Sequence, residues 1–171
     1  MIVDEVQTGN GRTGKYFAYQ NFNITPDIVT TAKGLGGGLP IGAVLFGEKL
    51  KNTVTPGRHG STFGGNPIAS AGAISIVKRI DDDFLLAVSE KSKYIKNEIA
   101  KWKNVENISG MGLMLGILTN KDAGEIAKEC LEKGLLVLTA HKNKVRLLPA
   151  LNISFAELNE GLDILKEVIE K

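Results

Sequence analysis

The chain has 171 residues, of which 43% are apolar and 23% are charged, as in an ordinary globular protein of one domain or one and a half. Its net charge of +2 comes from acidic and basic residues mixed along the sequence, which excludes a basic stripe for nucleic acid. The longest apolar runs are too short to cross a bilayer, and the N-terminus shows no secretory signal pattern.

The single cysteine, Cys130, excludes an internal disulfide and favours a reduced, cytoplasmic setting. It lies beside Leu131 in a helical pattern, so we interpret it as small core packing rather than as a nucleophile. His59 and His141 are the only histidines, and no metal-ligand spacing is present. We therefore predict no metal site.

Short strands and glycine-rich loops alternate through the first half of the chain. Apolar runs predict strands over residues 1–6, 27–31 and 41–46. The glycine-rich segments TGNGRTG and GLGGGLP are loops by composition, and a further loop over residues 53–66 is long enough to be functional or mobile. Pro67 suits the first turn of a helix that Asn66 caps.

The second half has the pattern of a small α+β unit. Helices are predicted from Asp81 to Ile99, from a capping box at Asp122 to Gly134, and from a capping box at Ser154 onward. Predicted strands cover residues 105–108, 111–118, 135–138 and 145–148. We place the boundary between the two parts at residues 78 and 79. The first part has too few helices to cover a sheet on both faces, which suggests a piece of a longer protein.

Asp4 and Glu5 follow the first predicted strand, where a buried parallel strand delivers side chains to its carboxyl edge. Three interpretations are open: the two residues are functional acids, they are solvated or helix-capping acids, or they form a Walker-B-like pair. The last reading needs a phosphate loop of the form G-x-x-x-x-G-K-[ST], which the sequence lacks.

Lys33 follows the second predicted strand and precedes a run of glycines that allow unusual backbone dihedrals. In a partly desolvated pocket such a lysine is an amine nucleophile toward an aldehyde, whereas the common alternative is a solvated loop lysine. The glycine run does not match G-x-G-x-x-G, so it is only a weak dinucleotide signal.

Two further segments carry candidate binding groups. Ser61 and Thr62 lie in a glycine-rich loop before a helix, which either holds a phosphate or forms a plain turn and cap. Arg146, in the segment KVRLLP, either pairs with an acid or binds a carboxylate. A nucleophilic lysine, an acid and a hydroxyl-bearing loop together suit pyridoxal phosphate, which has an aldehyde, a pyridine nitrogen and a phosphate.

Four segments resemble, in order and spacing, the class III aminotransferases: IVDEVQTGNGRTG, DIVTTAKGLGGGLPIGAVL, HGSTFGGNP and VRLLPAL. The resemblance covers essentially the whole chain. It implies an α/β protein of fold type I among the pyridoxal-phosphate enzymes. Residues 1–78 would be the C-terminal part of its large domain and residues 79–171 its small C-terminal domain.

The loops KGLGGGLPIGA and HGSTFGGNP resemble the branch of the family that transfers the amino group of N-acetylornithine to 2-oxoglutarate in arginine biosynthesis. Enzymes of the same scaffold that act on ornithine or 4-aminobutyrate are the alternative. A non-catalytic truncated domain is a second alternative, and a nucleotide-binding module a distant third.

The resemblance also implies roles for individual residues. Lys33 would carry the cofactor and move a proton, and Asp4 would pair with the pyridinium nitrogen. Gln7 would lie near the phenolic oxygen of the ring and Val6 against its face. Thr62 would reach across a homodimer interface to the phosphate of the other subunit's cofactor.

Substrate contacts would come from Ser61 and Arg146, the latter paired with a glutamate of the family. That glutamate and the rest of the cofactor pocket lie upstream of Met1 in the family. We therefore expect the chain to be inactive by itself.

Overall fold

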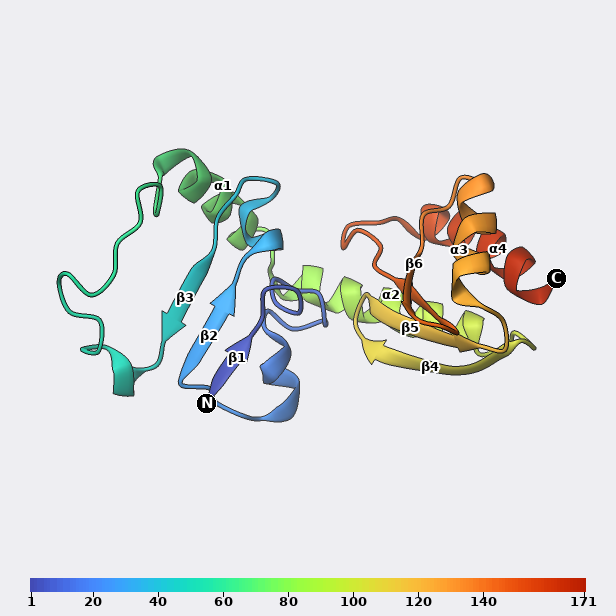
Figure 1. The fold of residues 1–171 in the computed structure, drawn as a ribbon, viewed down its shortest axis with the longest axis horizontal. Coiled ribbons are helices and arrows are strands. Elements are labelled where there is room, and N and C mark those ends of the chain that lie inside the picture. The colour runs from blue at the N-terminus through green and yellow to red at the C-terminus, as the bar shows by residue number, and fades with distance from the viewer. The chain divides into compact units, whose positions relative to one another are not determined.

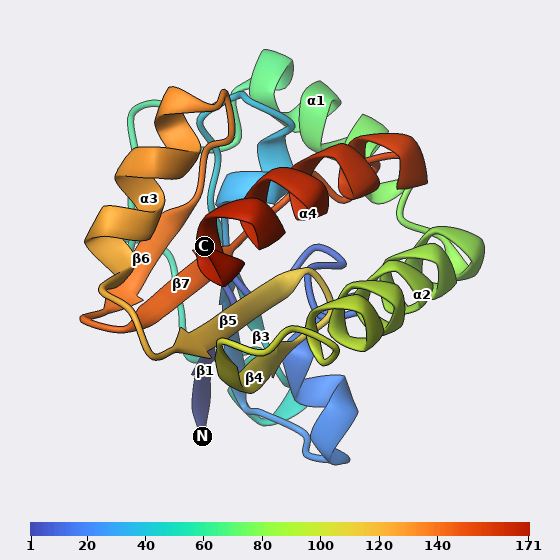
Figure 2. The ribbon, with the colours of Figure 1, turned by 90° about the vertical axis from the view of Figure 1, so that its right-hand side faces the viewer.

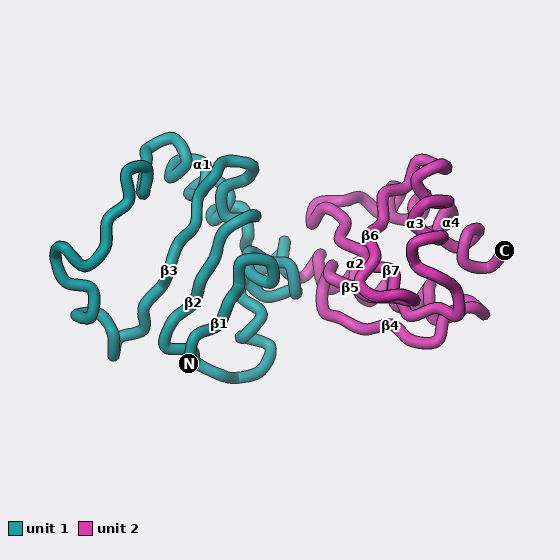
Figure 3. Tube along the Cα trace, in the orientation of Figure 1, with its two compact units in different colours: residues 1–85 teal, residues 86–171 magenta.

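Helices and strands alternate along the computed structural model, which describes residues 1–171 and is of mixed α/β type, as the sequence predicts. The chain divides into two compact units, Met1–Leu85 and Leu86–Lys171, coloured separately in Figure 3. Helix α2, Asp82–Ile99, spans this division. The division thus falls inside a helix, a few residues after the boundary expected from the sequence. The assignment of the two parts to a large and a small domain stays a prediction.

The first unit is built on a sheet of three strands in the order β1-β2-β3 (Figure 1). β1 (Ile2–Asp4) runs parallel to β2 (Ile28–Thr31), and β3 (Ala43–Phe46) runs antiparallel to β2. β1 is shorter than the predicted strand 1–6. The backbone turns after Asp4, where the Val6 amide donates to the Asp4 carboxylate rather than to a neighbouring strand.

Three short 3₁₀ helices and one α-helix complete this unit: η1 (Ala18–Phe22), η2 (Lys33–Gly36), η3 (Glu48–Leu50) and α1 (Pro67–Val77). α1 begins as predicted, since the Asn66 side chain accepts a hydrogen bond of 2.9 Å from the Ala69 amide and Pro67 occupies the first turn.

Glycines allow the η2 segment to pack tightly within the first unit. A Cβ atom on Gly72 of α1 would lie 2.7 Å from Leu39, and one on Gly36 would lie 2.8 Å from Ile41. Both distances are closer than carbon atoms approach without a clash. Gly36 and Gly72 therefore serve packing inside the chain.

The second unit contains a four-stranded antiparallel sheet in the order β4-β5-β7-β6. Its strands are β4 (Val105–Met111), β5 (Met114–Thr119), β6 (Leu138–His141) and β7 (Lys144–Leu147). Gly112 (φ 53°) lies in the tight turn of the first hairpin, so Met111 ends β4 instead of opening β5 as predicted.

The expected strand 135–138 was wrong in position, because β6 starts only at Leu138. The preceding helix, α3 (Ala123–Glu132), ends in a turn with Gly134 at φ 85°. There the Leu135 amide donates to the Cys130 carbonyl at 2.8 Å. Leu135 thus helps to close the helix, and the strand begins three residues later.

Three helices pack against one face of the sheet of the second unit. Figure 2 shows α4 (Phe155–Glu170) lying across the strands with α2 and α3 beside it. Alternate residues of β5 are buried, which is the pattern of a sheet covered on one side. Ser154 and Glu157 form the predicted capping box at the start of α4. No helix of the chain has the length and apolar character needed to span a membrane.

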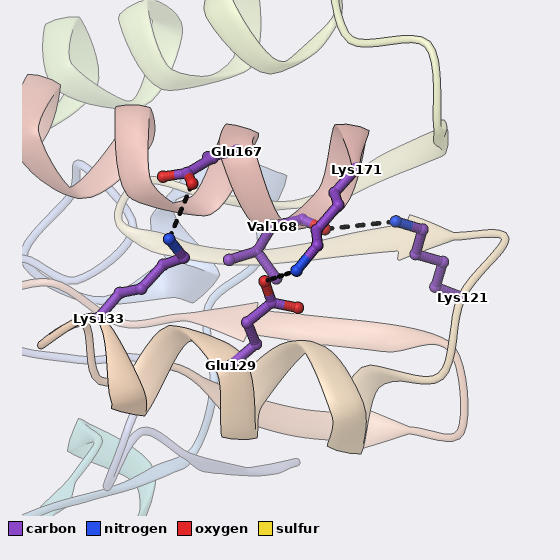
Figure 4. A network of polar contacts seen from close by, with 6 residues as sticks. All are labelled: Lys121, Glu129, Lys133, Glu167, Val168 and Lys171. Atoms are coloured by element: carbon purple, nitrogen blue, oxygen red, sulfur yellow. Dashed lines mark hydrogen bonds and ion pairs between the residues drawn. The ribbon is translucent and has the colours of Figure 1, made fainter.

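Exposed ion pairs tie α3 to α4 (Figure 4). Lys171 contacts Glu129 at 2.9 Å, and Lys133 contacts Glu167 at 2.8 Å. The Lys171 ammonium also donates its hydrogen bond to Glu129, which lowers the pKa of the Glu129 carboxyl below its ordinary 4.5. Such surface pairs contribute little each and are screened by salt.

The buried face of β5 sets the stability of the second unit. We expect Leu115→Ala, at a site only 2% exposed, to lower the free energy of unfolding by about 2–5 kcal/mol. Leu136→Ala, at a site 83% exposed, should change it by less than about 0.5 kcal/mol. Urea titration followed by fluorescence of Trp102, the single tryptophan and a buried one, measures both. Equal losses in the two variants would contradict this view of the core.

The Glu129–Lys171 ion pair makes a pH-dependent contribution to the stability of the fold. Because its folded pKa is depressed, Glu129 stabilises the fold above pH 4.5, and this contribution disappears as the pH falls through the folded value. We expect Glu129→Gln to lower the melting temperature slightly at pH 7, by progressively less as the pH falls below 4.5, and not at all in about 1 M salt. Glu160→Gln, exposed on the same helix pair, is the control. A loss that persisted in high salt would argue against an ionic origin.

Candidate functional site

β1 and β2 run side by side in the same direction (Figure 1). Asp4 ends β1 and Lys33 follows β2, so both residues belong to the carboxyl edge of these two strands. In the parallel register Asp4 lies opposite Thr30, and Lys33 opens η2 just after β2 ends. Neighbouring strands of a sheet are about 4.8 Å apart. The predicted acid therefore ends one strand and the predicted lysine follows its neighbour, three residues beyond the partner of Asp4, at the kind of sheet edge where α/β proteins bind ligands.

Hydrogen bonds fix the carboxylate of Asp4 through one of its two oxygens. Oδ1 accepts from the Val6 amide at 2.9 Å and from the Thr30 hydroxyl at 3.2 Å. Oδ2 accepts no hydrogen bond within the chain, and the residue is exposed. One oxygen thus orients the group, and the other is available to a donor outside the chain.

Lys33 has an unusual backbone and an unengaged side chain. Its φ of 47° lies in the left-handed region, which a residue with a Cβ adopts at a cost of about 1–3 kcal/mol. The side chain is exposed, and its amine makes no hydrogen bond or ion pair within the chain. Lys33 is therefore open to solvent where it follows the end of β2.

Glu5 has a structural role, unlike its neighbour Asp4. It is fully buried, and its carboxylate accepts a hydrogen bond of 2.9 Å from the Tyr19 amide and another from the Thr8 hydroxyl. A Cβ atom on Gly9 would lie 2.7 Å from the Glu5 carbonyl oxygen, so the turn requires glycine. Glu5 thus organises the loop after β1, and a Walker-B-like pair is wrong for these two acids.

The remaining predicted site residues are distributed over other elements. Val6 and Gln7 are half-buried in the loop directly after Asp4. Ser61 and Thr62 are exposed in the long loop between β3 and α1. This loop lies on the side of β3 that faces away from β1 and β2 (Figure 1). Arg146 belongs to β7 of the second unit, in register with Gly116 and Leu138. Their predicted roles stay predictions.

Two residues of the site were not found from the sequence, Thr30 and Asn10. The hydroxyl of Thr30 bonds to Asp4, and the side-chain amide of Asn10 donates to Thr31 and to the Ala32 carbonyl. Thr30 could have been found by aligning the two parallel strands on their amino ends. No sequence signal indicates the partners of Asn10.

The residues at this edge fit pyridoxal phosphate in their chemistry. Asp4 offers a free carboxylate oxygen, as a protonated ring nitrogen requires, and Lys33 offers an unengaged amine, as an aldehyde requires. The amide of Gln7 follows three residues after Asp4. The residues at this edge thus suit the pyridine ring and the aldehyde of pyridoxal phosphate.

Cys130 is a core residue, as the sequence predicts. It is fully buried in α3, and burial, followed by the nearby Glu129 carboxylate, raises the pKa of its thiol to about 11. A thiol of this kind is almost entirely protonated at neutral pH and is a poor nucleophile.

Sequence comparison gives a family and relatives. The family described as aminotransferase class-III matches residues 1–169. Acetylornithine aminotransferase of Clostridium acetobutylicum is 46% identical over 176 aligned residues, which cover 99% of this chain and 46% of that protein. The chain therefore spans about half the length of the curated relatives it matches.

Solved structures agree in fold. N-acetylornithine aminotransferase of Stenotrophomonas maltophilia matches with a TM-score of 0.85 at 37% identity, over 98% of this chain and 46% of that one. Ornithine delta-aminotransferase of Plasmodium falciparum matches with a TM-score of 0.86 at 31% identity, over 98% and 45%. Because the family match covers nearly every residue, the chain belongs to the class III aminotransferases, a family that uses pyridoxal phosphate.

Proposed function

We propose that the chain is the part of a pyridoxal-phosphate-dependent aminotransferase that carries the cofactor lysine. The enzyme would transfer the amino group of N-acetylornithine to 2-oxoglutarate, in arginine biosynthesis. The observation that carries this proposal is the pairing of β1 with β2, which puts Asp4 and Lys33 at one sheet edge. The 46% identity to an acetylornithine aminotransferase supports this choice of substrate.

Lys33 has two tasks in this proposal. Its amine holds the cofactor through the aldehyde, and, once displaced by the substrate, it carries the proton away from the substrate Cα. When bound, the pyridine ring of the cofactor accepts the electron pair that this deprotonation releases. The exposed position of the side chain gives the amine freedom for both tasks.

Asp4 keeps the ring nitrogen protonated. Its Oδ1 is already held by Val6 and Thr30, so Oδ2 is the oxygen that accepts from the ring. A carboxylate fixed in advance loses little freedom on binding, and a charge-assisted hydrogen bond to it favours the protonated nitrogen.

Other residues complete the proposed site. Gln7 binds the phenolic oxygen of the ring, and Val6 packs against the ring face. Thr62 contacts the phosphate of the cofactor in the second subunit of a homodimer. Ser61 and Arg146 contact the substrate, which has carboxylates that a serine hydroxyl and a guanidinium recognise.

We propose further that the first unit corresponds to the C-terminal part of a fold type I large domain and the second to its small domain. The chain by itself is proposed to be inactive. Two observations support this: Lys33 is exposed rather than enclosed, and the chain spans about half the length of its relatives. Desolvation of the reacting groups needs walls on every side of the cofactor.

An enzyme acting on ornithine is the second candidate function. The fold match to ornithine delta-aminotransferase, with a TM-score of 0.86, differs by only 0.01 from the match to N-acetylornithine aminotransferase, with 0.85. Fold likeness thus does not separate the two substrates. Sequence identity favours N-acetylornithine, at 37% against 31% among these two structures.

Covalent labelling tests the lysine directly. After addition of pyridoxal phosphate and borohydride, the Lys33 amine and the aldehyde should join with loss of water, and hydride should fix the product. We expect Lys33 to be labelled about tenfold faster than Lys49, a control lysine whose side chain is 84% exposed and outside the site. Peptide mass spectrometry locates the label. Preferential labelling of another lysine, or undiminished labelling of Lys33→Ala, would refute the assignment.

A chimera tests activity and substrate together. This chain replaces the matching part of the Clostridium acetobutylicum acetylornithine aminotransferase, so that the remaining pocket is supplied. The chimera should form glutamate from 2-oxoglutarate faster with N-acetylornithine than with ornithine or 4-aminobutyrate. Lys33→Ala should lower the rate by about 10³-fold or more, and the chain alone should give no turnover. A chimera that prefers ornithine would favour the second candidate function, and turnover by the chain alone would overturn the proposed inactivity.

A further inference from the structure

The side chain of Asn10 connects the loop after β1 to the end of β2. Asn10 is only 4% exposed. Its Nδ2 atom donates to the Thr31 hydroxyl at 3.0 Å and to the Ala32 carbonyl at 3.2 Å. These acceptors belong to the two residues that immediately precede Lys33. A buried side chain from a distant part of the sequence thus holds the backbone next to the proposed cofactor lysine.

The hydrogen bond from Asn10 to the Ala32 carbonyl constrains the peptide group that joins Ala32 to Lys33. The Ala32 carbonyl accepts a second hydrogen bond, of 3.0 Å, from the Leu35 amide inside η2. Two donors therefore fix the orientation of the Ala32–Lys33 peptide. This matters because Lys33 has a φ of 47°, a conformation that persists only where surrounding contacts impose it.

The two polar atoms of the Asn10 side chain differ in their hydrogen bonding: Nδ2 donates two hydrogen bonds, and Oδ1 accepts none. Its Oδ1 is buried and has no hydrogen-bond partner. A buried acceptor without a partner is unfavourable, and an apolar side chain of similar size would avoid it. The amide is therefore better explained by what Nδ2 holds than by packing. The Asn10 backbone, with φ 55°, also suits asparagine or glycine.

We propose that Asn10 is a positioning residue for Lys33. Through the Ala32 carbonyl and the Thr31 hydroxyl it maintains the left-handed turn that presents the lysine amine at the edge beside Asp4. Asn10 contacts neither substrate nor cofactor in this role. The inference rests on the proposed function, in which Lys33 carries the cofactor.

Two variants remove the donor in different ways. Asn10→Gly deletes the amide and keeps a residue that tolerates a positive φ. Asn10→Asp keeps the size and shape but at pH 8 offers the Ala32 carbonyl a carboxylate in place of a donor. Asn23→Gly is the matched control, because Asn23 has a φ of 53° and an exposed side chain away from Lys33.

The measurement is the rate of borohydride-trapped labelling of Lys33 by pyridoxal phosphate in the full 171-residue chain, relative to Lys49. We expect this ratio to fall about fivefold in Asn10→Gly and in Asn10→Asp, and to stay unchanged in Asn23→Gly. Circular dichroism of each variant shows whether the fold is kept. A purely structural role would alter the spectrum or both lysines, whereas a positioning role alters the ratio alone.

The outcomes separate this inference from the proposed function. If the unaltered chain labels Lys33 and the ratio is the same in a folded Asn10 variant, the positioning role is refuted while the proposed function stands. If both variants lose the fold, Asn10 serves stability and the positioning role is also refuted. If the unaltered chain shows no preference for Lys33, the proposed function fails, and this role fails with it.

Discussion

The parallel pairing of β1 with β2 is the constraint on which the candidate site depends. Its register puts Asp4 opposite Thr30, and the hydroxyl of Thr30 donates to the Asp4 carboxylate. A slip of one residue would turn every side chain of β1 to the opposite face of the sheet. Asp4 would then leave the edge where β2 delivers Lys33. The hydrogen bond between the strands therefore links the register of the sheet to the chemistry of the site.

Buried polar groups hold the loops that surround this edge. Glu5 accepts from a backbone amide and a hydroxyl of the loop after β1, and Asn10 donates to the end of β2. Such contacts replace a hydrophobic core where loops meet, because each buried polar group needs a partner. They give the strained backbone of Lys33 a rigid surrounding. The site is thus supported by hydrogen bonds inside the chain as well as by apolar packing.

The two units differ in how completely they bury their apolar surface. In the second unit, helices cover one face of the sheet and leave the other to solvent, as antiparallel sheets allow. In the first unit every residue of β3 is exposed, and Ile68 of α1 is also exposed. Apolar side chains exposed in this way are typical of a place of interaction. This agrees with a chain that spans about half the length of its relatives.

The sequence by itself determined the four α-helices and their starts, because apolar spacing and caps such as Asn66 and Ser154 act within a few residues. It also identified the family, and with it came the predicted roles of Lys33 and Asp4. Only the tertiary structure decided that Asp4 is exposed while Glu5 is buried, where β6 begins, and what Asn10 holds. Glu5 and Asn10 depend on contacts between separate segments, and local periodicity contains no information about which segments meet. The start of β6 depends on the turn that closes α3, which apolar spacing does not reveal.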